Sequence, residues 1–241
     1  DWVSDETEGR IEDLIPQGQL NAATRLVLTN AIYFNAAWQY PFEESQTSDS
    51  SFYLLNGQDV TISMMKQTEL FGYTNGEGYQ AVELQYDGAE LSMVILLPDP
   101  GQHVSFEEQL TADKVDEIID GLKYSQVALA MPKFEFESEF MMKDTLSAMG
   151  MPIAFSSGAD FSGMTGAKDL YIDQVIHKAF VSVDEAGTEA AAATAVDIKL
   201  TSMPAEPVKV TIDRPFIFFI RDIETGAILF VGRVLNPTDQ N

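Results

Sequence analysis

The chain has 241 residues, of which 45% are hydrophobic, and its 38 acidic and 14 basic residues give a net charge of -24. Such an acidic composition argues against nucleic acids and anionic membranes as partners, because binding to phosphates requires clustered cationic side chains. The absence of cysteine excludes disulfides and thiolate chemistry, and no apolar run reaches the roughly 18 residues of a membrane-spanning helix.

Strand patterns dominate the first half of the chain, after a helix end and a loop over residues 2–16. Residues 26–34 form a nearly unbroken apolar run, which predicts a strand buried on both faces. Further along, Asn75-Gly76 and Asp87-Gly88 are strong turn signals between successive strands. The strands predicted around these turns cover residues 60–65, 70–74, 79–84 and 91–97.

The second half mixes helices with strands. Helical periodicity predicts helices over residues 106–122 and 139–149, the second ended by Gly150 and Pro152. Strands are predicted over residues 170–184, 208–212, 216–221 and 228–234. No linker rich in proline, glycine or serine divides the chain, so the pattern predicts one α+β domain over residues 1–241.

Residues 185–200, EAGTEAAAATAVDIKL, are patterned both as a loop and as a strand. Every second position from Thr188 to Leu200 is small or apolar, and the positions between them carry the charged Glu189, Asp197 and Lys199. Strict alternation is typical of a strand with one buried face, although a run of alanines also favours a helix. We therefore predict a loop that can become a buried strand, which is a conformational switch.

Residues that would support enzyme chemistry are nearly absent. The two histidines, His103 and His177, have no third ligand at metal spacing beside them. The sequence contains neither a G-x-S-x-G nucleophile motif nor a Walker-type phosphate loop. The many carboxylates are expected to form solvated acidic surfaces. We therefore predict no catalytic residue, no metal and no cofactor, and the protein is expected not to be an enzyme.

Several separate segments resemble the serpin family of serine protease inhibitors. One segment of this chain resembles the hinge of an inhibitory serpin reactive-centre loop. Its matching residues are Glu185, Gly187, Thr188, Glu189, Ala190, Ala191, Ala192, Ala193 and Thr194. Other serpin segments resemble residues 26–38 (LVLTNAIYFNAAW), 210–220 (VTIDRPFIFFI) and 230–238 (FVGRVLNPT). The resemblance begins where a serpin leaves its helix F. It implies an incomplete serpin domain of large mixed and antiparallel sheets with few helices, without the N-terminal helical third.

The resemblance implies suicide inhibition. A protease would cleave the reactive-centre loop, about residues 185–207, and the freed hinge would insert into the central sheet. The family's spacing implies cleavage between Thr201 and Ser202, which would suit an elastase-like enzyme. Extra residues before Asp213 leave the register open. Cleavage after Leu200 would suit chymotrypsin- or subtilisin-like enzymes, cleavage after Lys199 trypsin-like enzymes, and cleavage after Met203 would lengthen the inserted segment.

Further residues match the parts of the serpin sheet that open. Asn30 and His177 match the shutter, and Trp38, Lys133 and Glu185 match the breach, where Lys133 and Glu185 are expected to form an ion pair. His177 also shares strand parity with apolar neighbours, which predicts that it points into the core and makes a buried hydrogen bond.

The resemblance also implies partners: a target serine protease, or a papain-like cysteine protease, and the N-terminal serpin portion, as another chain. It favours an extracellular or cell-envelope location, although no signal peptide is visible. The alternative is a non-inhibitory serpin that acts as a carrier, chaperone or storage protein. Such relatives tend to carry bulky, charged or proline residues in the hinge, and residues 188–194 have none at the inward-facing positions.

Overall fold

A computed structural model describes residues 2–22, 24–188 and 206–239. The chain divides into two compact units. Unit 1 is built from Asp1–Phe34 and Phe136–Val181, with Asn241, and unit 2 from Asn35–Glu135 and Ser182–Gln240. Large mixed sheets and few helices confirm the predicted α+β class.

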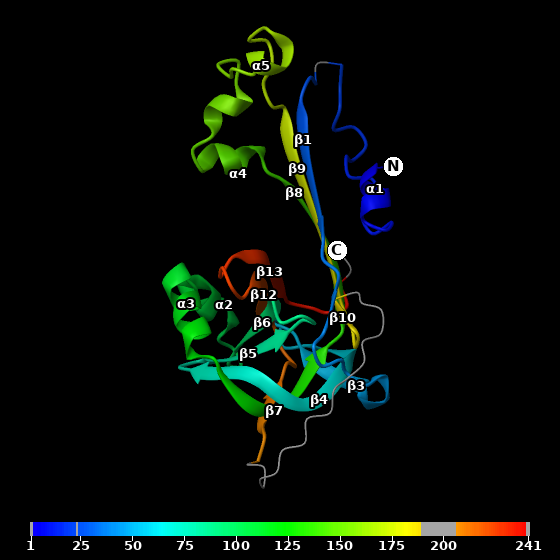
Figure 1. The fold of residues 1–241 in the computed structure, drawn as a ribbon, viewed down its shortest axis with the longest axis vertical. Helices are drawn as coiled ribbons and strands as arrows, with labels where there is room; N and C mark the ends of the chain where they lie inside the picture. The colour runs from blue at the N-terminus through cyan, green and yellow to red at the C-terminus, as the bar shows by residue number, and fades with distance from the viewer. Residues whose placement is uncertain (1, 23, 189–205, 240–241) are drawn as a thin grey trace. The chain divides into compact units, whose positions relative to one another are not determined.

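Unit 1 is organised around a sheet of three strands, β1 (Val27–Tyr33), β9 (Gln174–Val183) and β8 (Phe134–Met141). Their order is β1-β9-β8, and Figure 1 shows them side by side. β1 and β9 run parallel and pair directly, from Val27 opposite Gln174 to Tyr33 opposite Phe180. The helices of this unit are short: α1 (Trp2–Glu6), α4 (Lys143–Ala148), the 3-10 turn η2 (Pro152–Phe155) and α5 (Ser162–Thr165).

The prediction that residues 26–34 form a strand buried on both faces is right about the strand and wrong about its burial. Leu28 is 43% exposed, and Thr29 and Asn30 are exposed beside it. β1 lies at the end of the strand order in this sheet. A run of apolar residues indicates a strand, but it does not by itself determine how many faces are covered.

The helix predicted over residues 139–149 is wrong at its start, because residues 139–141 belong to β8. Glu137 and Glu139 are two residues apart, so they share one face of the strand. Both carboxylates contact Lys178 of β9, at 2.9 and 3.3 Å from its Nζ. This pairing of β8 with β9 outweighs local helix propensity, and the helix α4 begins only at Lys143.

Unit 2 is dominated by an eight-stranded sheet of order β11-β7-β4-β5-β6-β12-β13, with β3 also paired to β4. β11 and β7 are parallel, whereas the other neighbours for which a register is resolved are antiparallel. The strands are β3 (Ser48–Tyr53), β4 (Asp59–Gly76), β5 (Tyr79–Gln85), β6 (Leu91–Pro98), β7 (Lys123–Pro132), β11 (Val208–Thr211), β12 (Phe216–Asp222) and β13 (Ile228–Val234). A 3-10 turn, η1 (Glu44–Gln46), precedes β3.

The two strands predicted over residues 60–65 and 70–74 form the single 18-residue strand β4. It stays extended because β3 pairs with its first part and β7 with its middle, so partners are present along its length. The turn after β4 lies two residues later than the predicted Asn75-Gly76, at Glu77-Gly78, where Gly78 has a φ of 80° that favours glycine.

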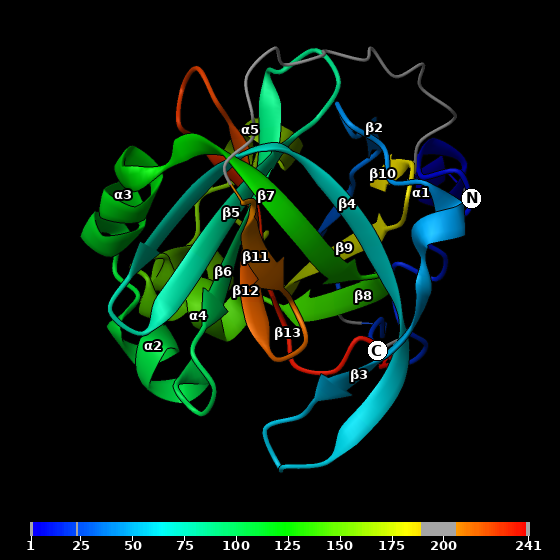
Figure 2. The same ribbon diagram turned by 90° about the horizontal axis from the view of Figure 1, so that it is seen from below.

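The helix predicted over residues 106–122 is two helices, α2 (His103–Gln109) and α3 (Ala112–Gly121). Thr111 separates them because it is the N-cap of α3, and its side chain accepts a hydrogen bond from the Lys114 backbone N–H. Both helices lie beside β5 and β6 (Figure 2). The core between helices and sheet contains Tyr79, Ala81, Val94, Leu96, Ile118, Ile217 and Phe219.

Candidate functional site

The segment singled out in the sequence enters a strand at its start. Gly187–Thr188 form β10, which pairs antiparallel with β2 (Ala36–Ala37), Gly187 opposite Ala37 and Thr188 opposite Ala36. We call residues 184–188 the anchor segment. The remaining predicted hinge and cleavage residues lie outside the described residues: Glu189, Ala190, Ala191, Ala192, Ala193, Thr194, Lys199, Leu200, Thr201, Ser202 and Met203.

Thr188 is completely buried, and its side chain has a specific partner. Its Oγ1 lies 2.8 Å from the hydroxyl oxygen of Tyr86, at hydrogen-bond distance. Tyr86 in turn stacks on Trp38, with ring centroids 4.7 Å apart and planes inclined by 11°. Burial raises the pKa of Tyr86 well above its usual value, so the hydroxyl stays protonated. The first inward-facing position of the alternating pattern is therefore buried in unit 2 with its hydroxyl hydrogen-bonded.

Gly187 lies too close to the neighbouring strand for a side chain. A Cβ atom there would lie 2.7 Å from the Cα of Ala37, and it would also overlap the carbonyl oxygen of Ala36. The carboxylate of Asp184 accepts the backbone N–H groups of Ala186 and Gly187 at 2.8 and 3.2 Å. Glycine at 187 therefore permits the close strand contact, and Asp184 holds the turn that precedes it.

Glu185 is held by two side chains. Its Oε2 lies 2.6 Å from the Nζ of Lys133, and its Oε1 accepts a 2.7 Å hydrogen bond from the hydroxyl of Thr47. Glu185 is only 8% exposed. Burial alone would raise its pKa, but the bonds from Lys133 and Thr47 outweigh burial, and the pKa lies below its usual value. The carboxylate is therefore a charged, satisfied group at neutral pH.

Backbone bonds also hold the anchor segment. The Trp38 backbone N–H donates to Ala186 O at 2.9 Å, and its indole Nε1 donates to Asp184 O at 3.0 Å. The Phe42 N–H donates to Glu185 O at 2.8 Å. Trp38 and Lys133, which the family resemblance grouped with Glu185, thus both contact the anchor segment. The partners Thr47, Tyr86 and Asp184 were not identified from the sequence, because nothing in their local pattern marks them.

Asn30 and His177 are brought opposite each other in the β1–β9 register. Asn30 is exposed and His177 half-buried, and among the described residues no hydrogen bond joins their side chains. The imidazole stacks instead against Phe140, with centroids 6.1 Å apart. The prediction that His177 points into the core and makes a buried hydrogen bond is therefore wrong.

The reason is that β9 carries apolar residues at both parities, so its pattern did not define the buried face. Around His177 the buried residues are Ile176, Lys178 and Phe180, whereas residues at the parity of His177 become buried only further along, at Val181 and Val183. Lys178 can occupy that set because its Nζ pairs with Glu137 and Glu139 and also donates to the backbone of Glu12. A lysine with its charge paired is tolerated in a buried position.

The described ranges 2–22, 24–188 and 206–239 contain no cluster of three or more histidine, cysteine or acidic side chains arranged to hold a metal ion. Within the same ranges, no helix has the length and apolar character needed to span a membrane. The anchor segment is held by both side-chain and backbone contacts, and it ends in the short strand Gly187–Thr188, both residues of which are buried.

Comparisons with known proteins agree with this arrangement. The sequence matches the model of the serpin (serine protease inhibitor) family over residues 1–237. It is 44% identical, over 99% of its length, to an uncharacterized serpin-like protein of Thermococcus kodakarensis, and 42% identical, over 98%, to the leukocyte elastase inhibitor of Sus scrofa. The structure is similar to that of human thyroxine-binding globulin, with a TM-score of 0.87 and 33% identity over 99% of this chain.

These matches cover only part of the other proteins: 56% of the archaeal protein, 65% of the porcine inhibitor and 63% of the globulin chain. The chain thus spans less than two thirds of each of them. Because the family model matches nearly the whole chain, and the fold agrees with a solved serpin at 33% identity, this protein belongs to the serpin family.

Proposed function

We propose that the protein is a suicide-substrate inhibitor of serine proteases, which cleave its reactive-centre loop and are trapped when the loop enters the central sheet as a strand. The observation that carries the proposal is that Thr188 is buried and paired with β2. The sequence that follows it is a hinge of small residues with the alternation of a strand. The proposed strand therefore already has its first two residues in a sheet.

In this mechanism the protease attacks the bond between Thr201 and Ser202 and forms an acyl-enzyme, after which the hinge from Thr188 to Thr194 adds to the sheet. β1 and β9 pair directly along the 7 residues of β1. A strand inserted between them would replace one hydrogen-bonded ladder with two. Each additional backbone hydrogen bond contributes about 1 kcal/mol net, so the bonds gained on insertion would drive it.

The small hinge residues serve this mechanism by shape. Side chains that face inward along an inserted strand must fit between packed neighbours, and overpacking a core costs about 1–3 kcal/mol. Thr188, Ala190, Ala192 and Thr194 are all small. The Glu185 contacts with Lys133 and Thr47 fix the point from which the strand grows, so entry starts in one register.

The target class follows from the residue before the cleaved bond. Threonine at 201 would suit an elastase-like pocket for small uncharged side chains. The likeness to a protein named leukocyte elastase inhibitor supports this choice. Cleavage after Leu200, Lys199 or Met203 remains the alternative set, and a papain-like cysteine protease is a second target class.

Because this chain spans less than two thirds of its relatives, the proposal includes a structural partner. We expect inhibition to require the N-terminal serpin portion, as another chain or as part of the same protein. That portion would cover exposed surfaces such as Leu28 of β1 and complete the sheet that receives the loop.

The alternative function is that of a non-inhibitory carrier, and the likeness to thyroxine-binding globulin favours it. The hinge composition distinguishes the two proposals, since a carrier does not need small residues along a segment that never inserts. The inward positions from Thr188 to Thr194 carry only small, uncharged residues, and those from Val196 to Leu200 carry larger apolar ones. This absence of charged residues at the inward positions favours inhibition.

The proposal is tested with the full-length protein that contains this chain. It is incubated separately with pancreatic elastase, subtilisin and trypsin, and the products are analysed on denaturing gels and by intact mass. An inhibitor gives a complex that survives denaturation and a released C-terminal peptide that begins at Ser202. Clean cleavage without a stable complex would contradict inhibition and leave the carrier function in its place.

A further inference from the structure

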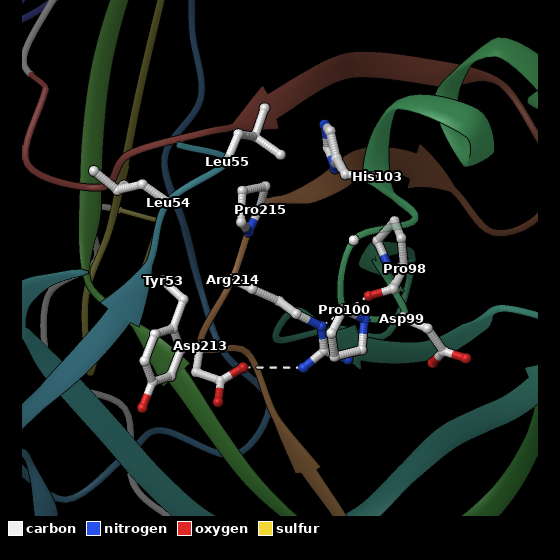
Figure 3. A pocket seen from close by; sticks show the side chains of 11 residues that line it. Tyr53, Leu54, Leu55, Pro98, Asp99, Pro100, His103, Asp213, Arg214 and Pro215 are labelled. Atoms are coloured by element: carbon white, nitrogen blue, oxygen red, sulfur yellow. Dashed lines mark hydrogen bonds and ion pairs between the residues drawn. The ribbon is translucent and has the colours of Figure 1, made fainter. Parts of the chain in front are cut away.

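A cavity of about 290 Å³ is lined by residues of unit 2, none of which belongs to the anchor segment. It is formed where the chain leaves β3, where it leaves β6, and where it enters β12. Figure 3 shows the side chains that line it. Most of the wall is apolar and includes an aromatic ring and three proline rings: Tyr53, Leu54, Leu55, Pro98, Pro100 and Pro215. Flat, rigid walls of this kind suit an aromatic or compact aliphatic body.

One polar group in the wall is unsatisfied. His103 is only 4% exposed, and neither of its ring nitrogens has a hydrogen-bond partner among the residues that the structure describes. The nearest carboxylate is that of Glu107, 3.8 Å from Nε2, which is beyond hydrogen-bond distance. Burial lowers the pKa of His103, and the charge of Glu107 and a contact with the Pro215 backbone offset this only in part, so the imidazole is neutral at neutral pH; the Pro215 contact does not have hydrogen-bond geometry.

A buried neutral imidazole offers one donor and one acceptor nitrogen. Leaving a buried polar group unpaired costs about 1–3 kcal/mol, and such groups are rare in folded proteins. Neither the fold nor the proposed inhibition makes use of this side chain. Its placement in the wall of a cavity therefore indicates a hydrogen bond to a bound molecule.

The rest of the cavity is held in place by bonds between its segments. Arg214 donates from Nε to the carbonyl oxygen of Pro98 at 2.8 Å and pairs with the Asp213 carboxylate at 2.9 Å. The Tyr53 backbone N–H donates to Asp213 O at 2.7 Å. These bonds connect all three segments of the wall. Such a frame is preorganised, which reduces the ordering that a ligand must cause on binding.

The charged side chains in the wall determine whether the cavity favours a positively or a negatively charged ligand. The positive charge of Arg214 is already paired with Asp213, whereas Asp99 is exposed and has no ion pair among the described residues. The remaining local charge is therefore negative, in a protein of net charge -24. In Figure 3, His103 lies in the upper part of the view, and Asp99 and the Arg214 side chain lie below it. An anionic ligand would be repelled by this wall.

We propose that this cavity binds a small organic molecule with an apolar, ring-sized body and a hydroxyl or amine donor, neutral or positively charged but not anionic. The donor bonds the free nitrogen of His103, the body packs against Pro98, Pro215 and Leu55, and a positive charge is stabilised by Asp99. This binding site is independent of the proposed protease inhibition.

The test uses four probes of similar size: phenol, tyramine, benzoate and toluene. Phenol and tyramine carry a donor, toluene lacks one, and benzoate carries a negative charge. This chain contains two histidines, His103 and His177, and each contributes its own set of imidazole proton signals. Titration with phenol or tyramine is expected to shift the signals of His103 and leave those of His177 unchanged. The variant His103→Phe assigns the signals, since those of residue 103 disappear.

Variants then separate the two polar contacts. His103→Phe keeps an aromatic ring and removes the unpaired nitrogens, so the fold is expected to be retained and phenol to bind about tenfold more weakly. Toluene binding should be unaffected by this change. Asp99→Asn should weaken tyramine and not phenol, and the matched exposed control Glu90→Gln should change neither.

Two results would overturn the proposal as a whole, and a third would contradict the contact with His103. One is a spectrum in which the His103 signals stay unmoved at millimolar phenol and tyramine. The other is benzoate binding as tightly as tyramine, because the wall would then not select against negative charge. Equal binding of phenol to the wild type and to His103→Phe would remove the role of the histidine and likewise contradict the proposed contact.

Discussion

The family resemblance placed two pairs of polar residues at the points where a serpin sheet opens. In the structure, the side chains of one pair contact each other and those of the other pair do not. Lys133 and Glu185 meet at 2.6 Å, and a third partner, Thr47, completes the contact. Asn30 and His177 are opposite each other in the β1–β9 ladder, yet one is exposed and the other stacks on Phe140. The anchor segment in unit 2 is fixed by side chains, whereas the β1–β9 pairing in unit 1 depends on its backbone ladder. The insertion that we propose would require this difference, because its strand would start at a fixed point and enter a ladder held by backbone bonds.

The largest effect is expected from a charge at the first inserted position. Thr188→Arg places a cation where the wild-type side chain is completely buried and bonded to Tyr86, and an uncompensated buried charge costs several kcal/mol. Insertion should stall, and the variant should be cleaved without trapping the protease. Denaturing gels of variant and protease measure the trapped fraction, with Thr188→Ser as the matched control. Unchanged trapping by Thr188→Arg would refute insertion as the mechanism.

The Glu185 contact should give a pH-dependent stability. The folded-state pKa of Glu185 lies below its usual value, so the charged form stabilises the fold above the unfolded-state pKa of about 4.5. This contribution is lost as the pH falls through the folded-state pKa. Glu185→Gln should destabilise the protein by about 1–2 kcal/mol at pH 7, and the difference from wild type should shrink on acidification. Urea unfolding at several pH values measures it.

A Glu185→Gln variant whose stability deficit stayed constant from neutral to acidic pH would contradict this account of the contact. Glu90→Gln, at an exposed position of the β5–β6 hairpin, is the control for loss of a carboxylate that has no described partner.

A smaller effect is expected from Tyr86→Phe, which keeps the stacking on Trp38 and removes only the hydroxyl. The Thr188 hydroxyl would remain buried without a partner, which costs about 1–2 kcal/mol. Thermal unfolding would measure the loss, and Tyr124→Phe, at a position 65% exposed, should change stability by much less. Equal effects of the two substitutions would show that the bond to Thr188 does not hold the anchor segment.

The smallest effect concerns Asn30 and His177. No hydrogen bond joins their side chains among the described residues, so a double-mutant cycle of Asn30→Ala and His177→Phe should give a coupling energy within about 0.5 kcal/mol of zero. Urea unfolding of the two single variants and the double variant measures it. A coupling above about 1 kcal/mol would show an interaction that the stacking on Phe140 does not explain.

The fold was largely predictable from the sequence where periodicity and turn chemistry agree. β5, β6 and β12 appear close to their predicted ranges, because runs of alternating or apolar residues end at clear turn signals. The errors in the predicted secondary structure occur where pairing with a segment far away in the sequence determines the local conformation. Residues 139–141 extend a strand because Lys178 pairs with that strand face, and residues 60–74 stay extended because β3 and β7 pair with them.

The candidate site could be predicted only in part. Glu185 and Lys133 were identified through family resemblance, and their opposite charges make a contact between them easy to expect. Thr47 and Tyr86 could not be found, since a single hydroxyl in an ordinary strand or turn carries no signal until the fold brings it to Glu185 or Thr188. His103 was noticed as a histidine without ligands, but only burial and the surrounding cavity show that its nitrogens lack partners.

The most direct measurement of the central claim is the thermal stability of the full-length protein before and after cleavage of its loop by elastase. If residues from Thr188 onward enter the sheet as a strand, the added backbone hydrogen bonds should raise the Tm of the cleaved protein by tens of degrees. The cleaved Thr188→Arg variant should show no such increase. A cleaved wild-type protein whose Tm is unchanged or lower would contradict strand insertion.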